Sequence, residues 1–268
     1  MRLYIYIYIY VYIIMYNKYT NFIKTQLNLN PEELDFKRNI DYCRILEHCS
    51  GSHAEKYFNV IIKKFKTFYE SNFDTLRNIC ELNDKYGKTK KYNLKNFMTC
   101  SPSNLRYLLH SLLFLEDMKK YKLNNIDIIE IGGGYGGLCF FIHNIAPLYE
   151  ININSYTIFD LLEPSLLQKK YLNLLNVPDV NCCQLDNFDN IKNDSILISN
   201  YAFSEISKEL QMKYIDKIIN PYTKFGFLTW NYIPVYNFVK NSVIEKEEEY
   251  PKTDNNNYYV RYYPIPNL

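Results

Sequence analysis

In the first part of the chain, the hydrophobic positions follow a helical pattern. Between about residues 30 and 85, apolar side chains recur every three or four positions, as at Tyr57, Ile61 and Phe65, which is the spacing of one helix face. Segment 31–33 begins with proline and continues with two glutamates, which predicts a helix start, because acidic side chains favour the positive end of the helix dipole. We therefore expect a helical N-terminal region.

The pattern changes after residue 125. Short runs rich in β-branched residues alternate there with helical segments, and these runs predict strands. The predicted strands are 126–131, 156–160, 180–185, 195–199 and 225–230. Strands that alternate with helices indicate a mostly parallel sheet with right-handed crossovers. We expect an α/β fold with a helical region at 15–97 and a Rossmann-like domain at 98–268, in which the polar segment 245–251 fits an edge strand, a lid or a tail.

Residues 4–14 alternate tyrosine with isoleucine or valine. The run is shorter than the roughly 17–25 residues of a membrane-spanning helix, and no small-residue cleavage site follows it. Strict alternation indicates a strand, but one with two apolar faces, which is prone to aggregate. A TA dinucleotide repeat encodes the same alternation. We therefore interpret residues 1–14 as a low-complexity extension that is either dispensable or mis-annotated, with Met1 and Met15 as the two candidate translation starts, and a real anchor is the alternative.

Composition and charge exclude several classes of protein. With 268 residues, 47% of them hydrophobic and 22% charged, the chain is long enough for a sizeable core and is neither disordered nor collagen-like. A net charge of +2 indicates no nucleic-acid partner. The seven cysteines include no C-x-x-C pair and the four histidines no H-E-x-x-H motif. We expect free thiols in a reducing cytoplasm, no structural metal and no membrane partner.

Five of the eight glycines lie between Gly132 and Gly137, directly after the first predicted strand. Glycine allows positive φ and lets a ligand approach the backbone, and a helix start behind such a loop presents free N–H groups. Gly132, Gly134 and Gly137 fit the dinucleotide pattern G-x-G-x-x-G. Glu130, Gly132, Gly134 and Gly136 fit E-x-G-x-G-x-G, the first motif of S-adenosylmethionine-dependent methyltransferases. We expect this loop to bind a cofactor.

Glu130 separates these two alternatives. A carboxylate at the end of the strand repels a pyrophosphate, but it suits the cationic amino acid end of S-adenosylmethionine. The acidic residue that the dinucleotide pattern expects about 20 residues further on is missing from residues 151–157. Asp160 ends the second strand, where a carboxylate can accept both ribose hydroxyls, and Asp186 follows the third strand, where it can meet the adenine amine. A helix cap or a turn is the alternative role for both residues.

The segments around the loop resemble the sugar O-methyltransferase family over about residues 98–232. Segment 129–138 is similar to the first motif of this family, segment 167–172 to its Leu-x-x-x-Tyr-Leu helix, and segment 199–205 to the Ser-Asn-x-Ala-Phe-Ser-Glu end of its fourth strand. Leu162 departs from the proline that often follows Asp-Leu in the family. The resemblance implies a Rossmann-like, S-adenosylmethionine-dependent enzyme that methylates a sugar hydroxyl.

Methyl transfer to a sugar hydroxyl benefits from a general base, which we expect beyond the carboxyl end of the fourth strand. Glu205 lies there and is the leading candidate, although it can instead favour the start of the following helix. Asn200 can orient either ligand, and Arg106 can bind a carboxylate or phosphate on either ligand. His110 and His143 are the alternative bases, and both also fit positions on a helix face.

Two other functions remain as alternatives. An NAD(P)-dependent oxidoreductase acting on a nucleotide sugar would use the same kind of glycine loop. A non-catalytic adaptor would keep the fold without turnover, and the presence of Glu130, Asp160 and Glu205 argues against it. The sequence therefore favours an S-adenosylmethionine site with a sugar or glycoconjugate acceptor.

Overall fold

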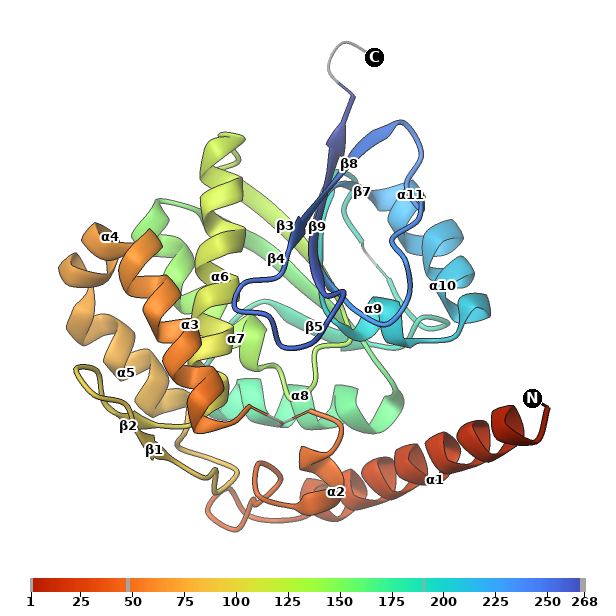
Figure 1. Ribbon diagram of the computed structural model, residues 1–268, viewed down its shortest axis with the longest axis horizontal. Helices are drawn as coiled ribbons and strands as arrows, with labels where there is room; N and C mark the ends of the chain where they lie inside the picture. Colours follow the sequence, from red (N-terminus) through yellow and green to blue (C-terminus); the bar gives the residue numbers. More distant parts are fainter. Residues whose placement is uncertain (1, 47–48, 190, 266–268) are drawn as a thin grey trace.

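The computed structural model describes residues 2–46, 49–189 and 191–265. At its centre is a seven-stranded sheet (Figure 1). Its strands, in chain order, are β3 (Asn125–Ile131), β4 (Asn152–Phe159), β5 (Val180–Cys183), β6 (Ser195–Asn200), β7 (Thr223–Trp230), β8 (Ser242–Glu248) and β9 (Tyr258–Pro264). A separate two-stranded sheet pairs β1 (Tyr92–Asn93) with β2 (Thr99–Cys100).

The strand order of the large sheet is β5-β4-β3-β6-β7-β9-β8. β3 pairs in parallel with β4 and β6, β4 with β5, and β6 with β7, whereas β9 runs antiparallel to both β7 and β8. Counted from β3, the first five strands follow the 3-2-1-4-5 order of the Rossmann fold. The predicted α/β, Rossmann-like fold is therefore confirmed, and its strand order reverses between β3 and β6.

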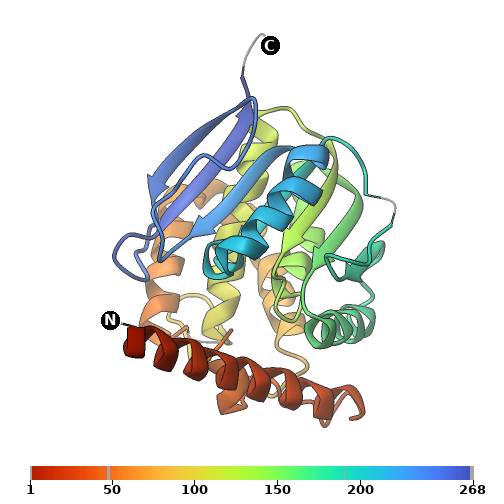
Figure 2. The same ribbon diagram turned by 90° about the vertical axis from the view of Figure 1, so that its right-hand side faces the viewer.

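Helices cover both faces of this sheet (Figures 1 and 2). They are α1 (Arg2–Leu27), α2 (Ile40–Cys43), α3 (Gly51–Lys64), α4 (Lys66–Ser71), α5 (Phe73–Asn83), α6 (Pro102–Lys120), α7 (Gly137–Ile145), α8 (Leu162–Leu174), α9 (Ala202–Glu205), α10 (Lys208–Tyr214) and α11 (Asn220–Tyr222). One face packs against α6, α7 and α8, with α3 outside α6, and the other packs against α10 and the π-helical turn that follows it. The N-terminal helices therefore form an outer layer on one side only.

The strand β3 is buried on both faces, which explains its β-branched sequence. Ile128 belongs to the hydrophobic cluster beneath α6, α7 and α8, and its neighbour Ile129 belongs to the cluster beneath α10. A strand covered on both sides has no polar face and reads as a continuous apolar run. The one acidic side chain in its second half, Glu130, is therefore unusual in this strand.

Residues 4–14 do not form the strand that their alternation indicates. They belong to helix α1, which runs along one end of the molecule (Figures 1 and 2). A strand needs a hydrogen-bonding neighbour, whereas a helix gains one internal bond for each residue that extends it. Residues 16–27 are helical and pack against α8, and the run continues this helix toward the N-terminus. Among the helices of the described residues, none is both long enough and apolar enough to cross a bilayer.

The helix start predicted at segment 31–33 is wrong. Turns occupy this stretch, and the next helix is α2, which begins at Ile40. The side-chain cap lies further along the chain: Asn39 Oδ1 accepts hydrogen bonds from the backbone N–H groups of Asp41 and Tyr42, and this cap starts α2. At the other end of the chain, the polar segment 245–251 contains the end of the edge strand β8.

Candidate functional site

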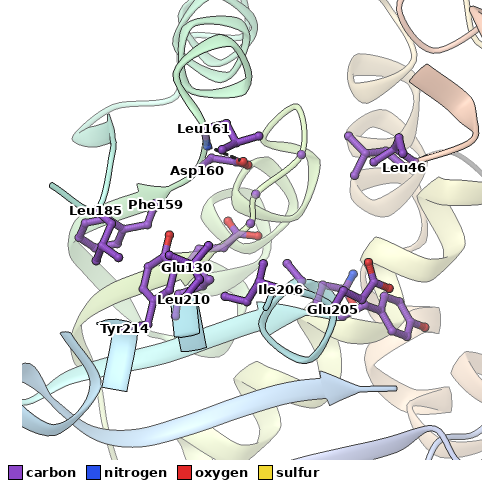
Figure 3. Close-up of a pocket in the computed structure, with 18 of the residues that line it drawn as sticks. Leu46, Glu130, Phe159, Asp160, Leu161, Leu185, Glu205, Ile206, Leu210 and Tyr214 are labelled. Atoms are coloured by element: carbon purple, nitrogen blue, oxygen red, sulfur yellow. Dashed lines mark hydrogen bonds between the residues drawn. The ribbon is translucent and has the colours of Figure 1, made fainter. Parts of the chain in front are cut away.

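A cavity of about 600 Å³ opens at the carboxyl ends of the parallel strands (Figure 3). It lies where the strand order reverses between β3 and β6, the place at which open α/β sheets bind ligands, and its volume is typical of a cofactor or substrate site. The predicted site residues that line it are Arg106, Glu130, Gly132, Gly134, Asp160, Asp186, Asn200 and Glu205. The structure therefore brings together every predicted residue except Gly136.

The glycine loop after β3 is tightly packed at both of its ends. Gly132 has a φ of 75°, and a Cβ added there would lie 2.1 Å from the Cβ of Ala202, a separation that real side chains do not reach. Gly136 has a φ of 90° at the start of α7, and a Cβ there would lie 3.0 Å from Leu172. Gly136 thus serves the turn into α7, and Gly132 and Gly134 face the cavity.

Glu130 is buried beside the loop, with 1% of its surface exposed. Its Oε2 accepts a hydrogen bond of 2.9 Å from the hydroxyl of Tyr156. Burial raises the pKa of Glu130 to about 8; the Tyr156 hydrogen bond opposes this shift and the Asp160 charge adds to it. The side chain is therefore largely protonated at neutral pH, and a cationic group bound in the cavity would favour its charged form.

The raised pKa of Glu130 predicts how stability depends on pH. The carboxyl titrates near 4.5 in an unfolded chain and near 8 in the folded protein, so the folded state holds the proton more tightly. The free energy of unfolding should therefore fall as pH rises through this window, by up to about 1.4 kcal/mol per pH unit. The glutamine of Glu130→Gln does not titrate. Thermal melts should therefore show that the stability of this variant relative to the wild type increases from about pH 5 to about pH 8. A difference that is constant with pH would contradict the assignment.

Asp160 follows β4 and faces the same cavity. Its Oδ1 accepts the backbone N–H of Leu161 at 2.8 Å, and its Oδ2 accepts the Nε2 of Gln168, also at 2.8 Å. Gln168 donates in addition to the carbonyl of Gly134, so this side chain ties Asp160 to the glycine loop. Burial raises the pKa of Asp160 to about 6, although these hydrogen bonds favour its charged form. Each carboxylate oxygen can still accept a further hydrogen bond from a ligand hydroxyl.

Beside Asp160 the cavity wall becomes apolar (Figure 3). The residues that line this part are Phe159, Leu185, Leu210 and Tyr214. Asp186 stands at its rim and is exposed; Lys217 Nζ lies 2.6 Å from its Oδ1, and this hydrogen bond lowers the pKa of the carboxyl. The slot thus offers an apolar surface to a flat ring, with a carboxylate at its edge that already has an ion-pair partner.

Glu205 lines the cavity on the side opposite Phe159 and Leu185 (Figure 3). Its Oε1 accepts a hydrogen bond of 2.7 Å from Nδ2 of Asn231, whose Oδ1 accepts from Ser204 at 2.6 Å. Removal from bulk water raises the pKa of Glu205 above its usual range, against the Asn231 hydrogen bond and the positive charge of Arg106. The carboxylate is therefore held in place and made more basic.

Two buried polar atoms in this wall lack hydrogen-bond partners among the described residues. Arg106 is 8% exposed and donates from Nη2 to the carbonyl of Leu46, but its Nε has no acceptor, and no carboxylate of the described residues forms an ion pair with it. Asn200 ends β6, and its buried Oδ1 accepts no hydrogen bond of normal geometry, although the side chain interacts with His110. A buried unpaired cation is costly, so the wall suits a ligand that carries an acidic group and a hydrogen-bond donor.

Sequence patterns do not predict Tyr201, which lines the cavity, or Glu249, which accepts a hydrogen bond from it. Tyr201 has a φ of 69°, which non-glycine residues rarely adopt, and its N–H donates to the carbonyl of Thr229. Its hydroxyl donates to Glu249, which is fully buried and also accepts from Thr253 and Asn257. Strained residues of this kind gather at functional sites, where their surroundings hold them. No local signal marks Glu249, because the contact joins distant parts of the chain.

Neither histidine considered as an alternative base lines the cavity. His110 is almost fully buried against the rings of Tyr57 and Tyr259, and burial lowers its pKa to about 3. His143 packs against Tyr156, and burial lowers its pKa to about 4. Such imidazoles are poor proton acceptors at neutral pH. Of the three candidate bases, Glu205 is the one that lines the cavity.

The cysteines are all free, and three of them, Cys80, Cys100 and Cys139, are buried. Over the described ranges, no group of three or more His, Cys, Asp or Glu side chains is arranged to hold a metal ion. The polar side chains that line the cavity carry carboxylates, amides, hydroxyls, one guanidinium and one ammonium group.

Comparison with known proteins adds a likeness of fold. No protein-family model matches the sequence, and no curated protein matches it either. Among solved structures, the citrinin polyketide synthase CMeT domain is 16% identical, with a TM-score of 0.45 over 62% of this chain and 55% of that one. The mitomycin 7-O-methyltransferase MmcR is 8% identical, with a TM-score of 0.43 over 62% of this chain and 56% of that one.

A third structure is that of the plantazolicin methyltransferase BpumL in complex with SAH, which is 15% identical, with a TM-score of 0.33 over 66% of this chain and 56% of that one. The chain thus spans little more than half the length of the structures it matches. At these identities the likeness concerns the fold, which the strand order establishes independently.

Proposed function

We propose that this chain is an S-adenosylmethionine-dependent O-methyltransferase. The observation that carries the proposal is the meeting of Glu130, Asp160 and Glu205 around one cavity at the switch point of a Rossmann-like sheet. The first two carboxyls lie beside the glycine loop, where a cofactor binds in this fold. The third faces the remaining space, where an acceptor would enter. Carboxyls on two separate sides of the cavity suit a cofactor and an acceptor bound together better than a single ligand.

The side chains of the cavity fit the parts of S-adenosylmethionine. Asp160 would accept the ribose hydroxyls, and the apolar slot beside it would hold the adenine ring. The carboxyl of Glu130 and the unpaired Oδ1 of Asn200 favour the amino group. The unpaired Nε of Arg106 suits either the carboxylate of the cofactor or an acidic group on the acceptor. When bound, the cofactor supplies an electrophilic methyl group.

Glu205 would act as the general base. A carboxylate with a raised pKa takes the proton of a hydroxyl as that oxygen attacks, and positioning the oxygen in line supplies much of the remaining acceleration. Asn231 fixes the orientation of the carboxylate, and the positive charge of Arg106 favours its ionised form. The chain's own residues would thus orient the acceptor and hold the proton at Glu205.

The acceptor that we propose is a sugar hydroxyl, in glycan or nucleotide-sugar modification. Support comes from the resemblance of segment 199–205 to a sugar O-methyltransferase motif and from the polar lining around Glu205, to which Arg106, Asn200 and Tyr201 contribute. A hydroxyl-rich acceptor needs such hydrogen-bonding groups. The free cysteines fit a reducing compartment, and we propose the cytoplasm.

The sugar assignment can be tested by methyl transfer from labelled S-adenosylmethionine. Panels of nucleotide sugars, free sugars and glycans should be compared with panels of phenols and carboxylic acids, with products identified by mass spectrometry. We expect label in at least one sugar and loss of that product when the methylated hydroxyl is replaced by hydrogen. Label only in phenols or acids would refute the sugar acceptor and retain the methyltransferase.

A further inference from the structure

The second half of helix α1 is fastened to helix α8. Lys170 Nζ donates to the carbonyl oxygens of Gln26 and Leu27 at 3.1 and 3.0 Å, at the end of α1 where backbone carbonyls lack partners within the helix. Lys24 forms an ion pair of 3.2 Å with Glu163 near the start of α8. These contacts fix the position of α1 through charged side chains as well as through apolar packing.

Helix α8 also holds the cofactor side of the cavity. It begins directly after Asp160 and Leu161, and its Gln168 donates to both Asp160 and the carbonyl of Gly134. One helix therefore carries Lys170, which holds α1, and Gln168, which holds the carboxylate and the glycine loop. Helix α8 thus links the position of the end of α1 to the cofactor side of the cavity.

Two tyrosines of α1 reach the cavity. Tyr16 and Tyr19 line it together with Asp160 and Leu161, and their ring centroids lie 6.2 Å apart in an edge-to-face arrangement. Tyr19 is 3% exposed and packs against Tyr42. Burial and the Asp160 carboxylate raise the pKa of the Tyr19 phenol, so it stays a neutral hydrogen-bond donor.

We propose that helix α1 is a wall of the cofactor site, in which Tyr16 and Tyr19 contact the nucleoside end of S-adenosylmethionine. The inference rests on the proposed function. A ribose hydroxyl both donates and accepts, and Asp160 supplies an acceptor while the Tyr19 hydroxyl supplies a donor nearby. The aromatic face of Tyr16 and the exposed Leu161 offer apolar surface to the adenosine. Residues 16–27 would then belong to the binding site.

Calorimetric titration tests this wall with two ligands, S-adenosylhomocysteine and 5′-methylthioadenosine, which has the nucleoside but lacks the amino acid end. Lys170→Met releases the end of α1, and Tyr19→Phe removes only a hydroxyl. We expect both variants to bind both ligands about three- to tenfold more weakly, the effect of one lost hydrogen bond or more. Lys169→Met is the matched control, because Lys169 is exposed on the same helix; it should bind as the wild type does.

The outcomes separate this inference from the proposed function. If the wild type binds S-adenosylhomocysteine and both variants bind both ligands as tightly as the wild type does, the inference that α1 is a wall of the cofactor site is wrong. The proposed function is then unaffected. If affinity falls for S-adenosylhomocysteine but not for 5′-methylthioadenosine, α1 contacts the amino acid end and the inference is also wrong. If the wild type binds neither ligand, the proposed function fails and the inference fails with it. If Lys170→Met does not fold, the Tyr19→Phe variant, in which the ring keeps its packing, decides between these outcomes alone.

Discussion

Replacement of Glu205 by glutamine should lower kcat about 100- to 10,000-fold, the usual contribution of a general base, and leave the affinity for S-adenosylhomocysteine unchanged. Glutamine has the same shape, and its Oε1 can still accept from Asn231, so the wall around it should stay in place. What it loses is the ability to take a proton at neutral pH. Initial rates with a sugar acceptor, together with calorimetry for the cofactor product, measure the two effects separately.

The matched control is Glu70→Gln. Glu70 lies on the surface of α4, where it pairs with Lys66 and neither residue lines the cavity, and an exposed pair of this kind contributes little to stability. Its variant should keep the wild-type kcat. In the wild type, the rate should rise with pH as Glu205 loses its proton, and this dependence should vanish in Glu205→Gln. A Glu205→Gln variant that turns over at a near-normal rate would show that Glu205 is not the base.

Replacement of Asp160 by alanine should weaken the binding of S-adenosylhomocysteine about 10- to 100-fold, because hydrogen bonds to a charged group each contribute about 1.5–3 kcal/mol. The same change frees Gln168 and loosens the contact between α8 and the glycine loop. Gln168→Met, which keeps Asp160 and removes the donor that ties it to the glycine loop, separates the two causes: it should keep most of the affinity if hydrogen bonding to the ribose dominates. Calorimetry measures both.

Asp194→Ala is the control for this experiment. Asp194 is exposed, forms an ion pair of 2.8 Å with Lys224, and does not line the cavity. It should bind the cofactor product as the wild type does. An unchanged affinity in Asp160→Ala would remove Asp160 from the binding site.

The sheet and the cofactor side of the cavity were predictable because local sequence determines them. The β-branched run that ends at Glu130 requires burial on both faces, and the glycines that follow are needed where φ is positive and a Cβ does not fit. The carboxyl ends of parallel strands meet at one edge, so Asp160 and Glu205 had to lie near that loop once the strand order was assumed.

The rest of the site depends on contacts that no local pattern encodes. Lys170 is one of several lysines until the end of α1 is placed beside it. Glu249 is one of a run of acidic residues, and only the pairing of β8 with β9 brings it beneath Tyr201. The Tyr/Ile run has no polar face that would specify a strand, and its structure follows from the helix it extends. The positions of these residues thus depend on long-range packing, which the periodicity of the sequence does not reveal.

The central claim is that the cavity binds S-adenosylmethionine, and the most direct measurement is calorimetric titration of the full chain with S-adenosylhomocysteine and, in parallel, with NAD⁺. The arrangement of Glu130 beside the loop and Asp160 after β4 predicts saturable binding of S-adenosylhomocysteine, whose amino group would stabilise the charged form of Glu130. It predicts no binding of NAD⁺, whose pyrophosphate would bring negative charge to this buried carboxyl and stabilise neither of its forms. Binding of NAD⁺ without binding of S-adenosylhomocysteine would contradict the account.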